Sequence, residues 1–493
     1  PAMNVVLITL DTMRADYLSS YGFESETTPN LDALAEKGVL FELAHSTAAV
    51  TPVSHASILT GLNQYHHRLR VLSALSGYRL PRDIPTLATL LKNAGYQTLA
   101  THSAFPVSAY FGLDQGFDTF LSFDATVDVE VDAAADSTAG GLASWDVSRY
   151  QRRSDETTDL ALASIRAAKA PFFLWVHYWD SHDTALRPPE GHWSYPGNLA
   201  SLPPEERRKA LYVTEVKYQD EQIGRLLDGL SGPDKEDNTL IVVTADHGEG
   251  LGDHGWGAHR ILYEEQVHVP LIIHVPGGPK GRRVRELVGA VDIVPTILDY
   301  IGVVPPPSLK FDGRSLRGLM DGKPDQPRTL YADQINGYDF NAKMVNRRPQ
   351  ADFLYSVTRD PWKLIYRPSF FDRSELYNLR EDPRETRNLW AVETNVRRDL
   401  LQELARRDSW CTQRFPETGE DDPDREAAAG ALESLGYVGG ESADAASDPR
   451  WAWTCIDHQD VLMDKRGVCP REGCGLRLIL RAREDAVSGP DGK

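Results

Sequence analysis

A segment rich in histidine and acidic residues, "TADHGEGLGDHGWGAH", follows an apolar run near the middle of the chain. It supplies Asp246, His247, Asp253, His254 and His259 as possible metal ligands. Carboxylates combined with imidazoles suit zinc, manganese or iron better than calcium, because calcium prefers a shell made only of oxygen. A single histidine in a loop is usually a solvated or capping residue, but this density of ligand types predicts a metal site.

A second segment, "TAAVTPVSHASILTG" at residues 47 to 61, is rich in hydroxyl side chains. A threonine hydroxyl is a weak nucleophile by itself, but coordination to a divalent cation lowers its pKa by many units. We expect a helix to begin near Ser54, so that Thr51 lies just before it, where a metal and the helix amides can both stabilise an oxyanion. The alternative is that Thr51 or Ser54 only caps this helix, and the segment alone does not decide between them.

The elements that must position these residues form an alternating pattern of strands and helices. "NVVLITL" at residues 4 to 10 is nearly all apolar, as expected of a strand buried on both faces. A helix is predicted over residues 29 to 37, with Thr28 as its cap, Pro29 at its first position and Gly38 after its end. Apolar strands recur at "QTLATHSAF", "PFFLWVHYWD" and "NTLIVVTADHG". This alternation predicts an α/β fold with a mostly parallel sheet flanked by helices.

Polar side chains follow several of these strands directly, namely Asp11, Asp180, Asp246 and His247. In parallel α/β sheets ligands bind at the carboxyl ends of the strands. Any one of these residues is explained by a strand that turns into a polar loop. Four of them together indicate a functional site.

The composition restricts the partners. The chain has 493 residues, 41% of them hydrophobic, and a formal net charge of −19. This acidic balance argues against a nucleic-acid-binding surface, because such surfaces depend on lysine and arginine. A small anionic ester remains possible where metal ions reverse the local field. No run approaches the roughly 20 apolar residues of a membrane helix. The compartment, cytoplasmic or periplasmic, stays open, as does the formation of a homo-oligomer.

The chain divides into three parts by pattern. We assign residues 1 to 329 to a catalytic domain, and residues 121 to 150, which are acidic and rich in alanine, serine and glycine, to a surface insertion or lid. Residues 330 to 440 predict a smaller α+β subdomain with an antiparallel sheet, including a hairpin that turns at Asp360 and Pro361. Residues 441 to 493 form a low-complexity linker and a cysteine-bearing tail.

The tail, "WTCIDHQDVLMDKRGVCPREGCGLRL", contains Cys455, His458, Cys469 and Cys474. Three cysteines and one histidine with glycines nearby suit tetrahedral zinc. The tail resembles small heavy-metal-binding modules of the form CPMHP...GxCPxCGM, although its second pair of cysteines is spaced more widely. The alternative is a disordered tail with incidental thiols. We expect a structural zinc ion here.

Eight segments resemble, in order, the successive blocks of the sulfatase family within the alkaline phosphatase superfamily. They include "LITLDTMRADYLSSYG", "TTPNLDALAEKGVLF", "TPVSHASILTG", "GLDQGFDTF", "TADHGEGLGDHG", "LYEEQVHVPLIIHVPG", "VDIVPTILDYIG" and "ELYNLREDPRETRNL". The resemblance covers roughly residues 4 to 440. It implies an alkaline-phosphatase-like fold and a metal-dependent ester hydrolase.

The chain departs from the sulfatase signature CxPSRxxLLTG, whose cysteine is oxidised to formylglycine. Thr51 stands at the cysteine position, Val53 at the proline position and His55 at the arginine position. Threonine cannot be oxidised to that aldehyde, because its β-carbon carries a methyl group. In this respect the segment resembles the related nucleotide pyrophosphatases and phosphoethanolamine transferases, in which threonine is the nucleophile.

The resemblance therefore implies a different release step. A formylglycine hydrate expels sulfate by collapsing to the aldehyde, whereas an esterified Thr51 must be freed by in-line attack of water, as occurs readily at phosphorus. We expect a hydrolase of phosphate diesters or phosphonate monoesters that forms a phospho-threonine intermediate. The alternatives are a sulfate-ester hydrolase that uses threonine directly and a transferase of phospho-alcohol groups.

The family pattern also implies a metal site that binds one or two ions of zinc or manganese. Where sulfatases have two adjacent aspartates this chain has Asp11 and Thr12, and the site gains an imidazole from His247. The first metal is expected to be bound by Asp11, Thr51, Asp246 and His247.

The sequence does not decide whether there is a second metal site. Asp180, His182 and His259 are its expected ligands, but His259 aligns with a substrate-contacting lysine, so His182 and His259 could instead contact the ester and protonate its leaving group. His55 and His102 are candidate substrate contacts or packing residues, and Arg14 is expected to brace the first loop.

Overall fold

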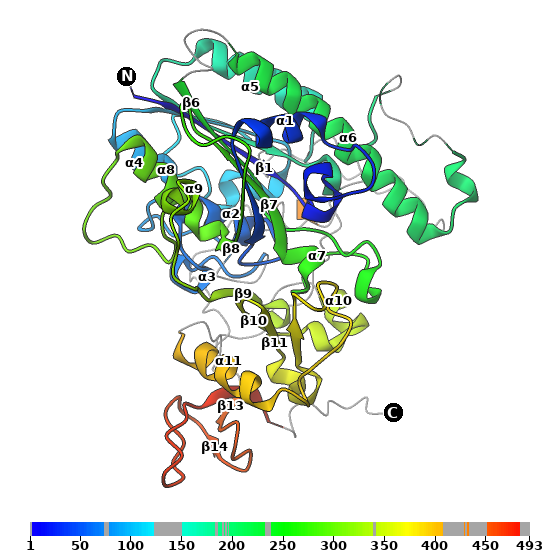
Figure 1. The fold of residues 1–493 in the computed structure, drawn as a ribbon, viewed down its shortest axis with the longest axis vertical. Helices are drawn as coiled ribbons and strands as arrows, with labels where there is room; N and C mark the ends of the chain where they lie inside the picture. The colour runs from blue at the N-terminus through cyan, green and yellow to red at the C-terminus, as the bar shows by residue number, and fades with distance from the viewer. Residues whose placement is uncertain are drawn as a thin grey trace.

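Figure 1 shows a large α/β domain above a smaller antiparallel sheet, with the C-terminal tail at the lower end. The computed structural model describes residues 2–72, 78–122, 150–182, 186–189, 192, 195, 197–231, 238–338, 342–407, 428, 431–432 and 451–483. Most of the acidic segment at 121 to 150 therefore lies outside the described residues, as do Cys411 and the linker before residue 451.

The large domain is built on an eight-stranded sheet with the order β4-β3-β5-β1-β6-β7-β2-β8. Neighbouring strands are parallel except where β7 pairs with β6 and with β2. The strands are β1 Asn4–Leu10, β2 Val39–His45, β3 Gln97–His102, β4 Thr119–Leu121, β5 Phe172–Tyr178, β6 Thr239–Ala245, β7 His268–His274 and β8 Arg282–Gly289. The predicted mostly parallel sheet is confirmed.

Helices cover both faces of this sheet. On one side α1, α5 and α6 pack together, and on the other α2 packs with α4 and α8 (Figure 1). The helices of this domain are α1 Pro29–Lys37, α2 Thr51–Thr60, α3 Gln64–His67, α4 Leu87–Asn93, α5 Ser154–Ala167, α6 Pro204–Leu230, α7 Glu264–Val267, α8 Ile293–Ile301 and α9 Arg317–Met320.

Local sequence signals explain several of these bounds. Every residue of β1, β5 and β6 is buried, as their apolar runs require when helices cover both faces. Helix α1 begins at Pro29 after Thr28 and ends before Gly38, as predicted, although the Thr28 side chain makes no capping bond. The predicted start of α2 is wrong by three residues. This helix begins at Thr51 because Pro52, with its fixed φ, suits the first turn of a helix.

The smaller subdomain is a four-stranded antiparallel sheet with the order β12-β11-β10-β9. Its strands are β9 Leu330–Gln334, β10 Leu354–Arg359, β11 Trp362–Tyr366 and β12 Glu375–Asn378. Residues Asp360 and Pro361 connect β10 to β11, which confirms the predicted hairpin. Its helices are α10 Ala342–Arg347 and α11 Thr394–Arg406.

The tail forms a third, three-stranded sheet with the order β14-β13-β15. Its strands are β13 Trp451–Thr454, β14 Leu462–Met463 and β15 Ile479–Ala482. One hydrophobic cluster joins the tail to the antiparallel subdomain, since Trp453 and Leu480 share it with Tyr366 and Leu401. Residues 451 to 483 are thus folded onto the subdomain, and the alternative of a disordered tail does not apply to them.

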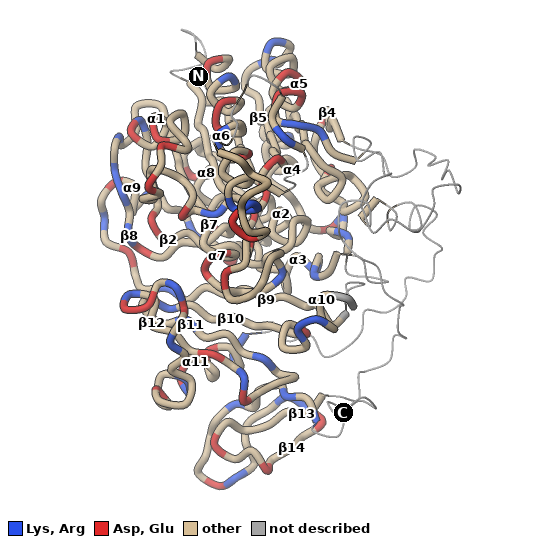
Figure 2. The backbone as a smooth tube through the Cα atoms, turned by 90° about the vertical axis from the view of Figure 1, so that its right-hand side faces the viewer, with Lys and Arg blue, Asp and Glu red and all other residues tan. Residues whose placement is uncertain are grey.

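Charges of both signs are interspersed along the face of the molecule in Figure 2. Among the described residues, none of the helices combines the length and the apolar composition needed to cross a bilayer.

Candidate active site

The candidate active site forms where β1 and β6 end side by side. Leu10 and Ala245 are paired in the parallel ladder, so Asp11 and Asp246 leave the sheet at the same level. Ligand atoms of Asp11, Asp246 and His247 all lie within 4.8 Å of one another, and the three residues are buried. Residues far apart in sequence meet here because the carboxyl ends of adjacent parallel strands share one edge of the sheet.

Each of the two carboxylates, Asp11 and Asp246, has one oxygen without a hydrogen-bond partner. Asp246 Oδ1 accepts hydrogen bonds from the amides of His247 at 2.7 Å and Thr12 at 3.1 Å. Asp246 Oδ2 and Asp11 Oδ1, however, are buried without a hydrogen-bond partner. Burial, followed for Asp11 by the charge of Asp246, raises the pKa of both groups well above the ordinary range. Two buried carboxylates and an imidazole with unsatisfied oxygens between them fit a divalent cation.

Thr51 occupies the first position of α2 and faces this group. Its Oγ1 lies 3.3 Å from His247 Nε2, and its hydroxyl lowers the pKa of both Asp11 and Asp246 against the larger effect of burial. No side chain caps α2. The Ser54 hydroxyl donates instead to the Val50 carbonyl at 2.9 Å. The alternative in which Thr51 or Ser54 serves only as a helix cap is therefore excluded.

The orientation of His247 is fixed by its neighbour. Its Nδ1 lies 2.9 Å from the Gly248 carbonyl oxygen, which can only accept a hydrogen bond, so Nδ1 carries the proton. The Nε2 lone pair then points to Thr51 and the carboxylates. Burial lowers the pKa of His247 well below its usual range, which keeps the ring neutral and able to act as a ligand.

His55 lies in α2 one helical turn after Thr51. The indole of Trp175 donates to Thr9 Oγ1 at 2.9 Å, and the Thr9 hydroxyl can then donate to His55 Nε2 at 3.0 Å. His55 Nδ1 donates to the Thr51 carbonyl at 2.8 Å. Burial lowers the pKa of His55 to about 4. Both ring nitrogens are thus engaged by protein groups, and the ring anchors the first turn of α2.

The sequence analysis missed His177, which lies on β5 opposite Thr9 of β1. Its Nε2 is 3.2 Å from Asp11 Oδ2, and burial lowers its pKa well below the usual range. A lone histidine in the buried run "FFLWVHYW" was the available signal, because an apolar strand has no local reason to bury an imidazole. His177 orients Asp11 in the way that outer-shell groups orient metal ligands.

The three residues expected to bind a second metal are separated. The Asp180 carboxylate accepts bonds from the Ser154 amide at 3.1 Å and the Ser154 hydroxyl at 2.5 Å, at the start of α5. The His182 ring stacks on Trp179 and lies 5.2 Å from the His259 ring, between ring centroids. The group of close ligand atoms around Asp11 contains none of these three residues.

His259 is next to His247, with 4.7 Å between the ring centroids. Its Nδ1 lies 3.2 Å from Glu249 Oε2, a second residue that the sequence analysis missed. Glu249 is buried and also lies 3.8 Å from an Arg208 guanidinium nitrogen. Burial, then the charges of His259 and His247, lowers the pKa of His182 well below its usual range. Together His182, His247 and His259 form an imidazole cluster beside Thr51.

His102 ends β3 in register with His177. Its ring packs against Phe120 and Trp175, with centroid distances of 4.2 and 5.0 Å, and neither ring nitrogen has a hydrogen-bond partner among the described residues. Burial lowers its pKa well below the usual range. The structure therefore encloses His102 in an aromatic environment one strand away from His177.

The loop after β1 is held in a strained conformation. Thr12 has a φ of 50°, which is rare for a β-branched residue. The Tyr212 hydroxyl donates to the Thr12 carbonyl at 2.7 Å and accepts from the Arg14 amide at 2.9 Å. The Arg14 guanidinium in turn binds Asp253 at 2.7 Å and the Glu249 carbonyl at 3.2 Å. The expected bracing role of Arg14 is confirmed.

A fully buried arginine, Arg260, also approaches the site, where its charge lowers the pKa of His247. The sequence analysis did not single it out. Its φ of 82° marks a second strained position in this loop. Permanent positive charge at this depth is suited to an anionic group.

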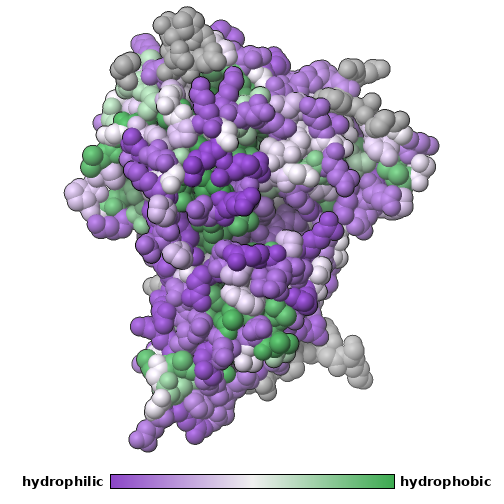
Figure 3. All heavy atoms as spheres, in the orientation of Figure 1, coloured by the Kyte–Doolittle hydropathy of each residue, from purple (hydrophilic) through white to green (hydrophobic). Residues whose placement is uncertain are grey.

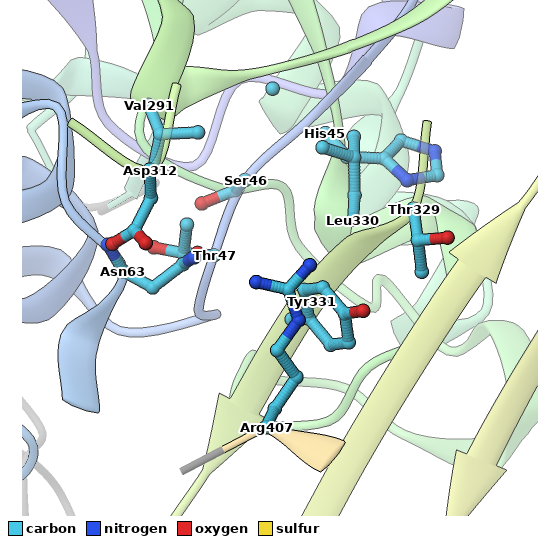
Figure 4. Close-up of a pocket in the computed structure, with 11 residues that line it drawn as sticks. His45, Ser46, Thr47, Asn63, Val291, Asp312, Thr329, Leu330, Tyr331 and Arg407 are labelled. Atoms are coloured by element: carbon cyan, nitrogen blue, oxygen red, sulfur yellow. The ribbon is translucent and has the colours of Figure 1, made fainter. Parts of the chain in front are cut away.

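A separate polar cavity of about 40 Å³ lies between the large domain and the antiparallel subdomain (Figure 4). Asp312, Thr47, Tyr331 and Arg407 are among its lining residues. A cavity of this size holds a few water molecules, since each needs about 10–15 Å³. It does not include Thr51 and is too small for an ester substrate.

Comparison with known proteins identifies the family. The model described as Sulfatase matches residues 3–303, and the model described as N-sulphoglucosamine sulphohydrolase, C-terminal, matches residues 252–409. This chain belongs to the sulfatase family. Sulfatase-family hydrolases are generally dependent on a divalent metal.

Curated relatives match more than 80% of this chain. The arylsulfatase of Clostridium perfringens (strain 13 / Type A) is 27% identical over 485 residues, which cover 83% of this chain and 96% of that protein. The N-acetylglucosamine-6-O-sulfatase of Bacteroides thetaiotaomicron is 26% identical, with coverages of 81% and 85%. The crystal structure of the phosphonate monoester hydrolase of Agrobacterium radiobacter has a TM-score of 0.63 at 24% identity, with coverages of 82% and 94%. This likeness confirms the alkaline-phosphatase-like fold.

Proposed function

We propose that this sulfatase-family protein is a metal-dependent hydrolase of phosphate diesters or phosphonate monoesters, with Thr51 as the nucleophile. The observation that carries the proposal is the position of the Thr51 hydroxyl. It starts α2, lies 3.3 Å from a neutral His247 nitrogen and faces two buried carboxylates, each of which has one oxygen without a hydrogen-bond partner. An unmodified alcohol at the formylglycine position favours transfer to phosphorus, because the esterified threonine is freed by in-line attack of water.

Asp11, Asp246, His247 and the Thr51 hydroxyl would hold the proposed cation, zinc or manganese, which would lower the pKa of that hydroxyl and neutralise charge on the ester. His177 orients Asp11, and His55 anchors the first turn of α2 so that Thr51 points into the site. The positive end of the α2 dipole and the buried Arg260 add to the field that attracts an anionic ester.

In the first step Thr51 Oγ1 attacks phosphorus and its proton leaves to solvent or to a neighbouring imidazole. The bond from phosphorus to the leaving oxygen breaks, and Thr51 carries the phosphoryl or phosphonyl group. We assign leaving-group protonation to His259, since the Glu249 carboxylate beside its Nδ1 orients the ring and compensates a positive charge. In the second step water attacks phosphorus, the Thr51 ester bond breaks, and the hydroxyl is restored.

We assign His182 and His259 to the ester rather than to a second metal ion. The support is the engagement of both Asp180 oxygens by Ser154, which leaves the two imidazoles without a carboxylate from that residue. His182 stacks flat on Trp179, so its ring edge is fixed. In this assignment one ion is sufficient at the active site. Two metal equivalents beyond the zinc ion expected in the tail, found by elemental analysis, would contradict it.

The second candidate function is hydrolysis of sulfate esters by the same threonine. It is favoured by the curated relatives, which carry the names arylsulfatase and N-acetylglucosamine-6-O-sulfatase. The intermediate would be a sulfate monoester of Thr51, which water would have to cleave, because no aldehyde is available for its collapse.

The test compares three aryl esters with the same p-nitrophenol leaving group: a phosphate diester, a phosphonate monoester and a sulfate. Equal leaving groups make kcat/KM report on the transferred group. We expect the two phosphorus esters to be preferred, and a preference for sulfate would overturn the choice. Adding an alcohol acceptor distinguishes hydrolysis from transfer to that alcohol.

Three variants test the nucleophile. Thr51→Ala should abolish turnover, and Thr51→Ser should retain part of it. Ser54→Ala removes a nearby hydroxyl that bonds only to backbone carbonyls, and it should leave turnover close to the original. Mass spectrometry of the quenched protein should find the adduct on the peptide that contains Thr51. Turnover by Thr51→Ala would refute the proposal.

A further inference from the structure

The tail contains a second cluster of metal-ligand side chains, remote from Thr51 in the chain. Cys455 follows β13 and is buried, His458 lies three residues later, and Cys469 and Cys474 lie in the turn that precedes β15. Ligand atoms of all four lie within 4.8 Å of one another. Figure 1 places this segment below α11, at the lower end of the molecule.

The distances between the ligand atoms match the edges of a zinc tetrahedron. Zn–S bonds of about 2.3 Å and Zn–N bonds of about 2.0 Å give S–S edges of about 3.8 Å and S–N edges of about 3.5 Å. The Cys455 and Cys474 sulfurs are 3.7 Å apart, and His458 Nδ1 lies 3.6 Å from the Cys455 sulfur and 3.5 Å from the Cys469 sulfur. A disulfide would need sulfurs about 2.05 Å apart, so none of these pairs is one.

Backbone amides in the turns around the cysteines face two of the sulfurs. The amides of Asp457 and His458 donate to the Cys455 sulfur, and the amide of Leu476 donates to the Cys474 sulfur. Donors of this kind orient sulfur ligands and balance their negative charge. The flanking residues Gly473 and Gly475 have φ values of 75° and 64°, a conformation that glycine adopts without strain and that lets the chain curl around its cysteines.

The small size of the tail also indicates that it needs a metal to stay folded. Its sheet consists of two four-residue strands and one two-residue strand, too little to enclose a core. Three of its apolar side chains, Leu462, Met463 and Val468, are 50%, 41% and 55% exposed. Hydrophobic residues are visible at this lower end of the surface in Figure 3. Small modules of this kind gain their folding energy from structural metals or disulfides.

Polar contacts connect the same segment to α11. Gln402 and Arg477 exchange two hydrogen bonds of 2.8 and 2.9 Å, and Arg398 forms an ion pair with Asp457 at 3.0 Å. The Arg466 guanidinium donates to the Ala405 carbonyl at 2.7 Å. Asp457 lies between two of the proposed ligands, so their geometry is coupled to the packing of the tail on α11.

We infer that Cys455, His458, Cys469 and Cys474 bind one zinc ion in a closed tetrahedral site, which holds residues 451 to 483 folded against α11. A closed site leaves no coordination position for substrate or water, so this ion takes no part in turnover. The inference does not depend on the function proposed for Thr51.

The test uses the full chain and elemental analysis after gel filtration. The double variant Cys469→Ser/Cys474→Ser should lose one equivalent of zinc compared with the unaltered protein. Cys411→Ser is the matched control, because it removes a cysteine that is not among the four ligands, and it should lose none. Asp246→Asn separates the two sites, since it should lose only metal bound near Thr51.

Cobalt substitution gives a readout specific to the tail. Thiolate ligands to Co²⁺ produce charge-transfer absorption in the near ultraviolet, which oxygen and imidazole ligands do not. The band should be present in Asp246→Asn and absent in the double variant. The double variant should keep its turnover number. Trypsin should cut it faster between residues 451 and 483. A band that survives in the double variant would overturn the inference.

A measurement on the unaltered protein covers the case in which the double variant does not fold. Titration with a mercurial reagent should release one zinc ion as three thiols react, as detected by a chromophoric chelator. Release of no zinc, or a disulfide between any two of the three tail cysteines in the non-reduced protein, would refute the site.

Discussion

Replacing Asp246 with asparagine should stabilise the protein without metal and destabilise it with metal. The Oδ1 atom of Asp246 accepts two backbone amides, and an asparagine carbonyl can keep both bonds. Its amide nitrogen would take the place of Oδ2, which has no hydrogen-bond partner and belongs to the group of ligand atoms that includes Asp11. The substitution thus exchanges a repulsive pair of carboxylates for an amide that can donate to Asp11.

The magnitude follows from the spacing of the ligand atoms. Two unit charges 4.8 Å apart, the upper limit for these ligand atoms, repel by about 3.5 kcal/mol at an effective dielectric constant of about 20. Protonation of one carboxylate reduces this repulsion, since burial raises the pKa of both groups. The gain is therefore largest at alkaline pH, where it corresponds to a rise of several degrees in melting temperature.

Bound metal should reverse the order of the two proteins. A metal present at about 1,000 times its dissociation constant stabilises the native state by about 4.1 kcal/mol, which exceeds the repulsion that the substitution relieves. The unaltered protein should gain this stability, and Asp246→Asn should gain little of it because it lacks one carboxylate ligand. Thermal unfolding followed by fluorescence, in chelator and in Mn²⁺, measures both effects. Any loss of tail zinc in chelator affects both proteins and cancels in the comparison.

Asp220→Asn is the matched control. Asp220 is also a buried carboxylate, but its two oxygens accept hydrogen bonds from the amides of Leu31 and Asn30 at 2.9 Å, at the start of α1. An asparagine there loses an acceptor, so it should lower the melting temperature equally with and without metal. If Asp246→Asn behaves like this control, or keeps the full metal-induced shift, the reasoning about the carboxylate pair is refuted.

Of three further predictions, two concern residues of the site and the third concerns Glu385, a buried carboxylate between β12 and α11. Tyr212→Phe leaves the Thr12 carbonyl without its partner and should cost about 1–3 kcal/mol of unfolding free energy, measured by urea denaturation, with weaker Mn²⁺ binding. His177→Ala frees Asp11 and should weaken Mn²⁺ binding by about 10–100-fold in calorimetry, and unchanged affinity would count against its orienting role. Burial raises the pKa of Glu385 from 4.5 to about 8, so its stabilising contribution is complete below about pH 4.5 and is lost as pH rises through 8. The melting temperature of the unaltered protein should therefore fall relative to Glu385→Gln over that interval, and parallel curves would exclude the shift.

Much of the fold could be predicted because its signals are local. The apolar runs at β1, β5 and β6 are visible in the sequence, since helices bury both faces of these strands. The start of α2 was harder to predict from the sequence. Thr51 stands at its first position with its side chain turned to His247 instead of capping the helix, and local capping preferences pointed to Ser54.

The candidate site was only partly predictable. Asp11 and Asp246 could be inferred, because both follow strands of one parallel sheet. Asp180 follows a strand of the same sheet, yet its carboxylate binds Ser154 at the start of α5, and a sequence pattern does not reveal which way a strand-end side chain turns. His177 and Glu249 act through contacts with Asp11 and His259, so their roles depend on tertiary packing that spacing along the chain does not encode.

The replacement of two cationic side chains by imidazoles connects the site to the proposed chemistry. His55 and His259 stand where the sulfatase pattern that this chain resembles has an arginine and a lysine. Burial lowers the pKa of His55 to about 4, so the ring is neutral at physiological pH and supports Thr51 through a hydrogen bond instead of contributing charge. In the proposed function, the attraction for an anionic ester would come from a cation held between Asp11 and Asp246 and from Arg260. With two cationic side chains replaced by imidazoles, a site of this kind would depend more strongly on metal, and the proposed threonine nucleophile would need the same metal to become reactive.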